Sequence, residues 1–200
     1  MMIKSDETEV EEVPTIKESP IESPDDIVRE ISRRRVLAEY SADIPPERIQ
    51  CLIEAPDRLE TSDEFQKAAE GEGFTPSERI LGWSKDLESP AHVRRGDVPT
   101  EIATMAHEDL HRMTSPETLR EMSASEPTNQ LYEGITEYFS EKSVEDLHGH
   151  VAGECYPEQV AMAKALADDV GEDSLRAYFF RHELTDGLQK AMERHAEGCV

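Results

Sequence analysis

A chain of 200 residues is long enough for one domain and a tail, and its formal net charge of −24 bounds what it can bind. Nucleic acids and anionic membranes would repel such a chain, so neither is an expected partner. No stretch approaches the roughly 18 consecutive apolar residues that a membrane-spanning helix needs. The acidic residues 1–30 lack the apolar core of a signal peptide. We therefore expect a cytoplasmic protein, or one exported by a signal-peptide-independent route.

The three cysteines are typical of a protein from a reducing compartment. Cys51, Cys155 and Cys199 are an odd set without CxxC spacing, which favours free thiols over a disulfide framework. Cys155 follows His148 and His150, so these three side chains are candidates for a second metal site. A glycine- and histidine-containing loop that binds no metal is the more ordinary interpretation of this segment.

The N-terminal part of the chain is predicted to change from disorder to helix. Residues 1–23 carry many carboxylates and prolines and few apolar side chains, which is typical of a disordered acidic leader. Ser23, followed by Pro24 and two aspartates, predicts a helix start. The predicted inner face of this helix consists of Ile27, Ile31, Val36 and Leu37. The basic cluster Arg33-Arg34-Arg35 is expected to neutralise nearby acidic side chains rather than to bind a polyanion.

Two short helices and two strands are predicted to follow. The helices cover 46–52 and 62–70, and Ser62-Asp63 is the expected cap of the second one. The strands cover 79–83 and 92–94 and are joined by a proline-containing loop.

The segment 100–113 is predicted to be a helix, capped by Thr100, that carries the motif HExxH. His107 and His111 are one turn apart, so both imidazoles project from one face and can bind one zinc ion. Glu108 adjoins that face, where it could deprotonate a water held by the metal. The alternative is an accidental motif, with two surface histidines on an acidic helix.

A second helix is predicted to start at Ser125-Glu126-Pro127-Thr128 and to supply a carboxylate to the same site. Its buried stripe consists of Leu131, Ile135, Tyr138 and Phe139. On the other flank, either Glu133 or Glu137 can bind the metal while the other accepts the second ring N–H of a histidine ligand. Gly134 between them would let another backbone approach closely. A solvated glutamate pair is the alternative interpretation.

Three further helices are predicted over 157–169, 173–182 and 184–196. Their predicted core residues are Val160, Leu166, Leu175, Phe179, Leu188 and Met192. With a small sheet before the HExxH helix, these elements predict an α+β fold that is predominantly helical.

The two motifs together resemble those of the gluzincins, the thermolysin-like clan of zinc metallopeptidases. In that clan HExxH is followed by a Glu-Gly-x-[Ala/Thr]-x-Tyr element, and here Glu-Gly-Ile-Thr-Glu-Tyr-Phe begins at position 133. The resemblance implies that His107, His111 and Glu133 hold the metal, that Glu108 is the general base and that Glu137 supports a histidine ligand. No third histidine follows in the arrangement that metzincins require.

The resemblance covers residues 75–185 and extends to small bacterial toxin and effector metallopeptidase domains. It implies a minimal zincin fold in which residues 24–200 form a single metallopeptidase-like domain. It also implies that the strand 92–94 is a sheet edge that binds the substrate backbone as an added strand.

The predicted function is hydrolysis of peptide bonds in a protein substrate by an endopeptidase with one zinc ion per chain. Tyr156 and His150 are the preferred donors to the developing oxyanion, because they follow the second helix in a segment that can reach the cleft. Four other side chains are candidates for this role: Tyr132, Tyr138, His148 and His182.

Three alternatives remain open from the sequence. The first is a regulatory metallopeptidase that cleaves a repressor, although no helix-turn-helix partner domain is evident. The second is a non-catalytic zinc-binding or acidic protein-interaction domain, which a closed shell of four protein ligands would support. The third is a helical adaptor in which the motif is accidental.

Overall fold

The computed structural model describes residues 23–55, 57–78, 80–84, 89–147 and 156–197. Within these ranges the helices are α1 (Pro24–Tyr40), α2 (Pro46–Glu54), α3 (Ser62–Gly71), α4 (Val98–Met113), α5 (Pro116–Met122), α6 (Glu126–Ser143), α7 (Pro157–Val170), α8 (Glu172–Arg181), α9 (Asp186–Glu197) and the short 3₁₀ helix η1 (Glu145–Leu147). The strands are β1 (Arg58–Glu60), β2 (Gly82–Trp83) and β3 (His92–Arg94).

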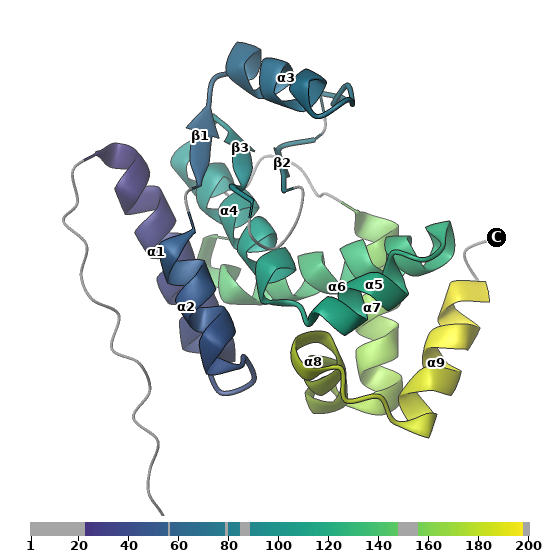
Figure 1. The fold of residues 1–200 in the computed structure, drawn as a ribbon. Coiled ribbons are helices and arrows are strands. Elements are labelled where there is room, and N and C mark those ends of the chain that lie inside the picture. The colour runs from purple at the N-terminus through teal and green to yellow at the C-terminus, as the bar shows by residue number, and fades with distance from the viewer. Residues whose placement is uncertain (1–22, 56, 79, 85–88, 148–155, 198–200) are drawn as a thin grey trace, which may run out of the picture.

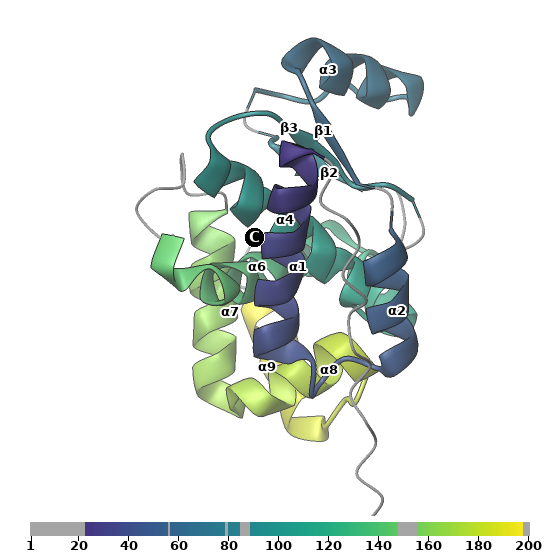
Figure 2. The ribbon, with the colours of Figure 1, turned by 90° about the vertical axis from the view of Figure 1, so that its left-hand side faces the viewer.

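Helix α4 lies in the middle of the molecule, between α1 on one side and α6 on the other (Figures 1 and 2). The small sheet and α3 lie at one end, whereas α8 and α9 lie at the other end (Figure 1). Helix α7 packs along α6, and α9 packs on α7. This arrangement confirms the predicted α+β, predominantly helical fold. Among the described helices, none is long and apolar enough to span a membrane.

Several helices start at a side chain that accepts the backbone N–H group three residues further on. Ser115 and Ser125 cap α5 and α6 in this way, and the start at Ser125 is the predicted one. The predicted cap at Thr100 is wrong, because Asp97 accepts the Thr100 N–H and α4 begins at Val98. Pro99 then lies in the first turn, where its missing N–H leaves no bond unmade.

The cap of α3 also differs by one residue from the prediction. Thr61, not Ser62-Asp63, caps this helix, and Glu64 reaches back to the Thr61 N–H to complete a capping box. The same reciprocal arrangement joins Ser23 and Asp26 at the start of α1, where the sequence predicts a helix start.

The sheet has the order β1-β3-β2, with β1 parallel and β2 antiparallel to β3. The strand 92–94 is therefore the central strand, and the prediction that it forms the free edge is wrong. The unpredicted strand β1 pairs with one of its sides, because Arg58–Glu60 lies in register with His92–Arg94. The edge nearest the HExxH helix belongs to β2, which contacts α4.

The core joins aromatic side chains from α1, α6 and α8. Tyr40, Phe139, Phe179 and Phe180 are buried and contact one another. All six core residues predicted for the last three helices are buried, namely Val160, Leu166, Leu175, Phe179, Leu188 and Met192. Ile27 is the exception among the predicted core residues of α1, because 44% of it is exposed.

Gly134 lies where the backbone of α7 comes close to α6, as its place in the sequence predicts. A Cβ at this position would lie 2.3 Å from the backbone oxygen of Gln159 in α7. No side chain fits there, so glycine permits the close packing of the two helices.

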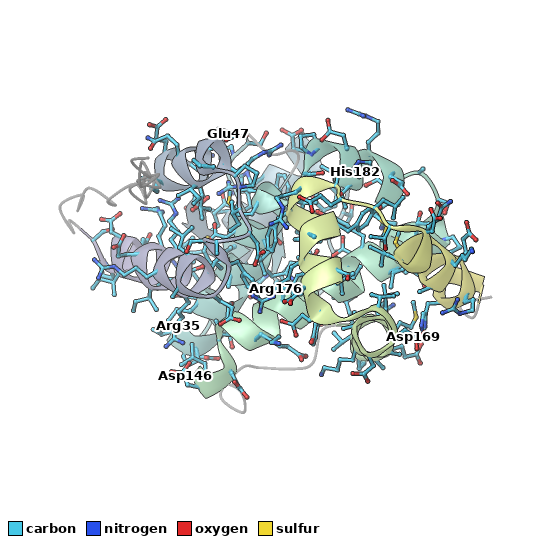
Figure 3. All side chains as sticks on the ribbon, turned by 90° about the horizontal axis from the view of Figure 1, so that it is seen from below. Arg35, Glu47, Asp146, Asp169, Arg176 and His182 are labelled. Carbon is cyan, nitrogen blue, oxygen red and sulfur yellow. The ribbon has the colours of Figure 1, made fainter. Side chains whose placement is uncertain are left out.

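The arginine cluster of α1 pairs with acidic side chains, which confirms the expected neutralisation. Arg33 binds Asp57, Arg34 binds Glu30, and Arg35 binds Asp146 at the surface (Figure 3). The cluster is thus divided among three separate acidic partners and presents no continuous basic surface.

Candidate metal centre

Helix α4 places both histidines of the HExxH motif on the face that turns toward α6. Their Nε2 atoms lie 2.9 Å apart, and the two rings meet edge to face. The side chains of His107 and His111 are 11% and 16% exposed, so the pair is shielded yet reachable. The one-turn spacing has therefore produced the convergent pair that a single metal ion requires.

Glu133 of α6 completes a triangle of donor atoms with the two histidines. Its Oε2 lies 3.4 Å from the Nε2 of His107 and 3.4 Å from the Nε2 of His111. With bonds of about 2.1 Å, two ligands of a tetrahedral zinc ion lie about 3.4 Å apart. The donor set of two imidazoles and one carboxylate also suits zinc. These residues fit the ion, and the two Nε2 atoms need to separate by only a fraction of an ångström.

Glu137, one turn further along α6, contacts the other ring nitrogen of His107. Its Oε2 lies 2.6 Å from Nδ1, on the side away from the donor triangle. A carboxylate in this position accepts the Nδ1–H and leaves Nε2 free for a metal. The geometry therefore favours Glu133 as the third ligand and Glu137 as the support of His107.

Glu108 is buried beside the histidines, against the edge strand β2. Only 3% of the residue is exposed, and its Oε2 has no hydrogen-bond partner among the described residues. A Cβ on Gly82 would lie 2.8 Å from Glu108 Oε1, so the strand and the carboxylate are in direct contact. Burial raises the pKa of the Glu108 carboxyl above its ordinary value, although His111, His107 and Ser84 oppose this shift.

The electrostatics of the cluster favour a positive charge at its centre. Burial alone would lower the pKa of His107, but Glu133 and Glu137 raise it well above its ordinary value. Burial alone would raise the pKa of Glu133, but His111 and His107 hold it well below its usual range. The carboxylates that favour a proton on His107 also attract a divalent cation, which would displace that proton.

The candidate oxyanion donors lie in different places relative to the two histidines. Tyr156 precedes α7, and its ring stacks on that of His107 with the centroids 6.1 Å apart. His150 and His148 lie outside the described residues, as do Cys155 and Cys199. The hydroxyl of Tyr138 donates to Glu172, and His182 pairs with Glu121. Of the described candidates, Tyr156 and Tyr132 are next to the histidines.

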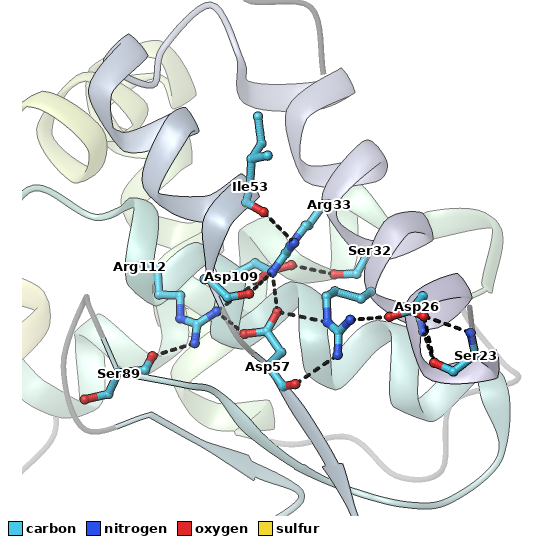
Figure 4. A network of polar contacts seen from close by, with 11 residues as sticks. Ser23, Asp26, Ser32, Arg33, Ile53, Asp57, Ser89, Asp109 and Arg112 are labelled. Carbon is cyan, nitrogen blue, oxygen red and sulfur yellow. Dashed lines mark hydrogen bonds and ion pairs between the residues drawn. The ribbon is translucent and has the colours of Figure 1, made fainter. Parts of the chain in front are cut away.

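A buried polar network joins α4 to α1 and to Asp57 (Figure 4). Asp109 accepts from the Ser32 hydroxyl of α1 at 2.8 Å, and Arg112 pairs with Asp57, which precedes β1. Arg33 contacts the same Asp57 at 2.7 Å. The network thus joins α4 to α1 and to the residue before β1, and removal of one member would leave a buried charge without its partner.

Sequence reasoning missed several of these contacts. Tyr132 was considered only as an oxyanion donor, although its hydroxyl lies 2.9 Å from Nδ1 of His111. The contact between Gly82 and Glu108 and the pairing of Arg112 with Asp57 were not predicted. The glycine before Trp83 was the only local sequence signal of the close approach to Glu108. No local sequence signal predicted the buried polar network behind α4.

The chain was also compared with known proteins. No protein-family model, no curated protein and no solved structure matches it. The resemblance to gluzincins therefore remains a prediction from two motifs, and the geometry around His107, His111 and Glu133 carries the functional argument.

Proposed function

We propose that this protein is a zinc-dependent peptidase of the gluzincin type that hydrolyses peptide bonds in a protein or peptide substrate. One observation carries the proposal. His107 Nε2, His111 Nε2 and Glu133 Oε2 form a donor triangle, and the buried carboxylate of Glu108 lies beside it with an unpartnered oxygen. Three protein ligands and a neighbouring base are the composition of a catalytic zinc site.

When bound in such a site, zinc lowers the pKa of a water to about 7 and polarises a carbonyl oxygen. Glu108 supplies the base: its free Oε2 accepts the proton from the attacking water and then delivers it to the leaving nitrogen. Burial favours this role, because a carboxylate whose pKa is raised is a stronger base. We assign to the Tyr156 hydroxyl the role of hydrogen-bond donor to the carbonyl oxygen of the substrate, because the Tyr156 ring lies beside His107.

We infer that the substrate backbone binds along the edge of β2. Strand β2 pairs with β3 on one side, and no described strand pairs with its other side. Gly82 in this strand contacts Glu108. An extended peptide added along β2 would thus lie next to the catalytic base, held by main-chain hydrogen bonds.

The non-catalytic alternative is less well supported. A structural zinc site normally has four protein ligands, whereas the described residues supply three donor atoms. A buried carboxylate with a free oxygen also has no use in a purely structural site, where it costs desolvation.

The proposal is tested by the hydrolysis of a degenerate peptide library and of an unfolded protein, followed by mass spectrometry. We expect cleavage by the wild type, its loss on zinc removal, and at least a 100-fold loss in Glu108→Gln. Glu101→Gln is the control, because this buried glutamate of the same helix binds the Gly96 N–H instead. Equal cleavage by Glu108→Gln and wild type would contradict the mechanism, and no cleavage by zinc-loaded wild type would favour the interaction domain.

A further inference from the structure

The second ring nitrogen of His111 begins a chain of hydroxyl groups. His111 Nδ1 lies 2.9 Å from the hydroxyl oxygen of Tyr132. That hydroxyl lies 3.2 Å from Oγ1 of Thr114, and Thr114 Oγ1 lies 3.0 Å from the carbonyl oxygen of Leu110. The chain of hydrogen bonds therefore leaves α4 at His111, passes through Tyr132 of α6 and returns to the last turn of α4.

The last acceptor fixes the direction of the whole chain. The carbonyl oxygen of Leu110 can only accept, so the Thr114 hydroxyl donates to it. Thr114 Oγ1 is then an acceptor for the Tyr132 hydroxyl, whose single proton is used there. The Tyr132 oxygen is left to accept, and His111 Nδ1 must carry the proton. The opposite orientation would lose the bond between Tyr132 and Thr114.

We propose that Tyr132 and Thr114 are positioning residues that hold His111 as the tautomer protonated on Nδ1, which leaves the Nε2 lone pair for the metal. This inference rests on the proposed metal site. The two histidines would then be prepared in different ways, because His107 is held by the carboxylate of Glu137 and His111 by two neutral hydroxyls. A neutral acceptor orients the ring without adding another negative charge to a site that already contains three glutamates.

Burial makes the chain of hydroxyls hard to replace by water. Tyr132 is 2% exposed, Thr114 is fully buried, and the Tyr132 ring stacks on Phe179. A missing hydroxyl would therefore leave a ring N–H or a phenol proton unpaired rather than hydrated.

The test measures the dissociation constant of Zn²⁺ by competition with a chelator, at one pH, for variants that break the chain at each link. We expect Tyr132→Phe to weaken zinc binding about 10- to 100-fold, as the loss of an outer-shell partner typically does. Thr114→Val should also weaken it, because the freed Tyr132 hydroxyl can then donate to Nδ1 and favour the tautomer that cannot bind zinc. Thr114→Ser keeps the hydroxyl and should restore the wild-type constant.

Two controls separate this role from general stabilisation. Tyr40→Phe removes a buried hydroxyl that donates to the Phe139 carbonyl oxygen in the same helix α6, and it should leave zinc binding unchanged. Thr114→Val added to Tyr132→Phe should cost nothing more, since the chain is already broken. Thermal melting of the metal-free variants checks that each one folds.

The outcomes distinguish the inference from the proposed site. If the wild type binds zinc and the dissociation constants of Tyr132→Phe and Thr114→Val are unchanged, the proposed role of the hydroxyl chain is overturned, whereas the metal site is not. Additive losses in the double variant would also overturn it. Failure of the wild type to bind zinc would overturn both.

Discussion

At the scale of single residues, the site depends on three glutamates with different surroundings. Glu133 faces both Nε2 atoms, Glu137 contacts only Nδ1 of His107, and Glu108 is buried against β2. Their roles as ligand, support and base are assigned from these positions. Under the proposed function, the same residue type would serve three purposes, because each carboxylate meets a different neighbour.

Gly82 is the residue that allows β2 to approach Glu108, the proposed base. A Cβ there would lie 2.7 Å from Thr104 Cγ2 and 2.8 Å from Glu108 Oε1, so Gly82→Ala must displace the carboxylate. We expect at least a tenfold loss of kcat while zinc content stays at the wild-type level, because misplacement of a catalytic group costs rate rather than metal.

Gly96→Ala is the matched control for this change, since its added Cβ would meet only Thr100, at 4.0 Å. Steady-state kinetics and metal analysis of the two variants check the prediction. If Gly82→Ala hydrolyses peptides at the wild-type rate, the contact with Glu108 has no catalytic importance.

At the scale of elements, the packing of α6 on α7 depends on Gly134. Gly134→Ala places a Cβ 2.3 Å from the Gln159 backbone oxygen, which is not at the end of a flexible side chain, so the helices must separate. We expect a loss of about 1–3 kcal/mol in the free energy of unfolding, as is typical of overpacking. Urea unfolding measures it.

The control for this prediction is Gly71→Ala at the end of α3, where an added Cβ meets nothing within 4 Å. Equal stabilities of Gly134→Ala and wild type would show that the two helices do not need their close approach. Since Gly134 follows Glu133, the variant also tests how far the third ligand depends on this packing.

The elements were largely predictable, and the exceptions have a physical explanation. Capping residues and apolar spacing predict helices well, as at Ser23 and Ser125. Strands of two or three residues carry too little periodicity, so β1 was missed. The edge position of β3 came from the resemblance to gluzincins, and the pairing with β1 contradicts it. The order of strands depends on pairing between distant segments, which no local pattern encodes.

The site was predictable to the extent that helical spacing determines it. The one-turn spacing of His107 and His111 and that of Glu133 and Glu137 follow from sequence, and the structure brings both pairs together. The partners that orient them come from elsewhere in the chain. Asp57, for example, contacts Arg112 across 55 positions, and only the fold establishes such a contact.

At the scale of the whole molecule, the net charge of −24 destabilises the folded state through repulsion between like charges. Each internal ion pair offsets part of this repulsion. Glu172 is the clearest case, because it accepts from Tyr138 at 2.8 Å and pairs with Lys142 and Arg176. Partial burial would raise its pKa, but these three neighbours lower the pKa of Glu172 to about 2. The side chain thereby joins α8 to α6.

Glu172 should make stability depend on pH in acid. Because its pKa is lower in the folded than in the unfolded chain, its contribution is present above its ordinary pKa and is lost as the pH falls toward about 2. We therefore expect the stability difference between wild type and Glu172→Gln to shrink between pH 6 and pH 2. Urea unfolding at several pH values measures it, and Glu47→Gln on the exposed surface of α2 corrects for the removal of a charge (Figure 3). A difference that is constant over this range would contradict the expected role.

The central claim is that His107, His111 and Glu133 hold one zinc ion, and elemental analysis of the purified protein tests it most directly. We predict about one zinc per chain in the wild type and in Glu108→Gln, and none in Glu133→Ala. Glu137→Ala should retain the ion with weaker affinity, because this glutamate contacts only the outer nitrogen of His107. Zinc retained by Glu133→Ala, or no zinc in the wild type after the metal is added back, would contradict the claim.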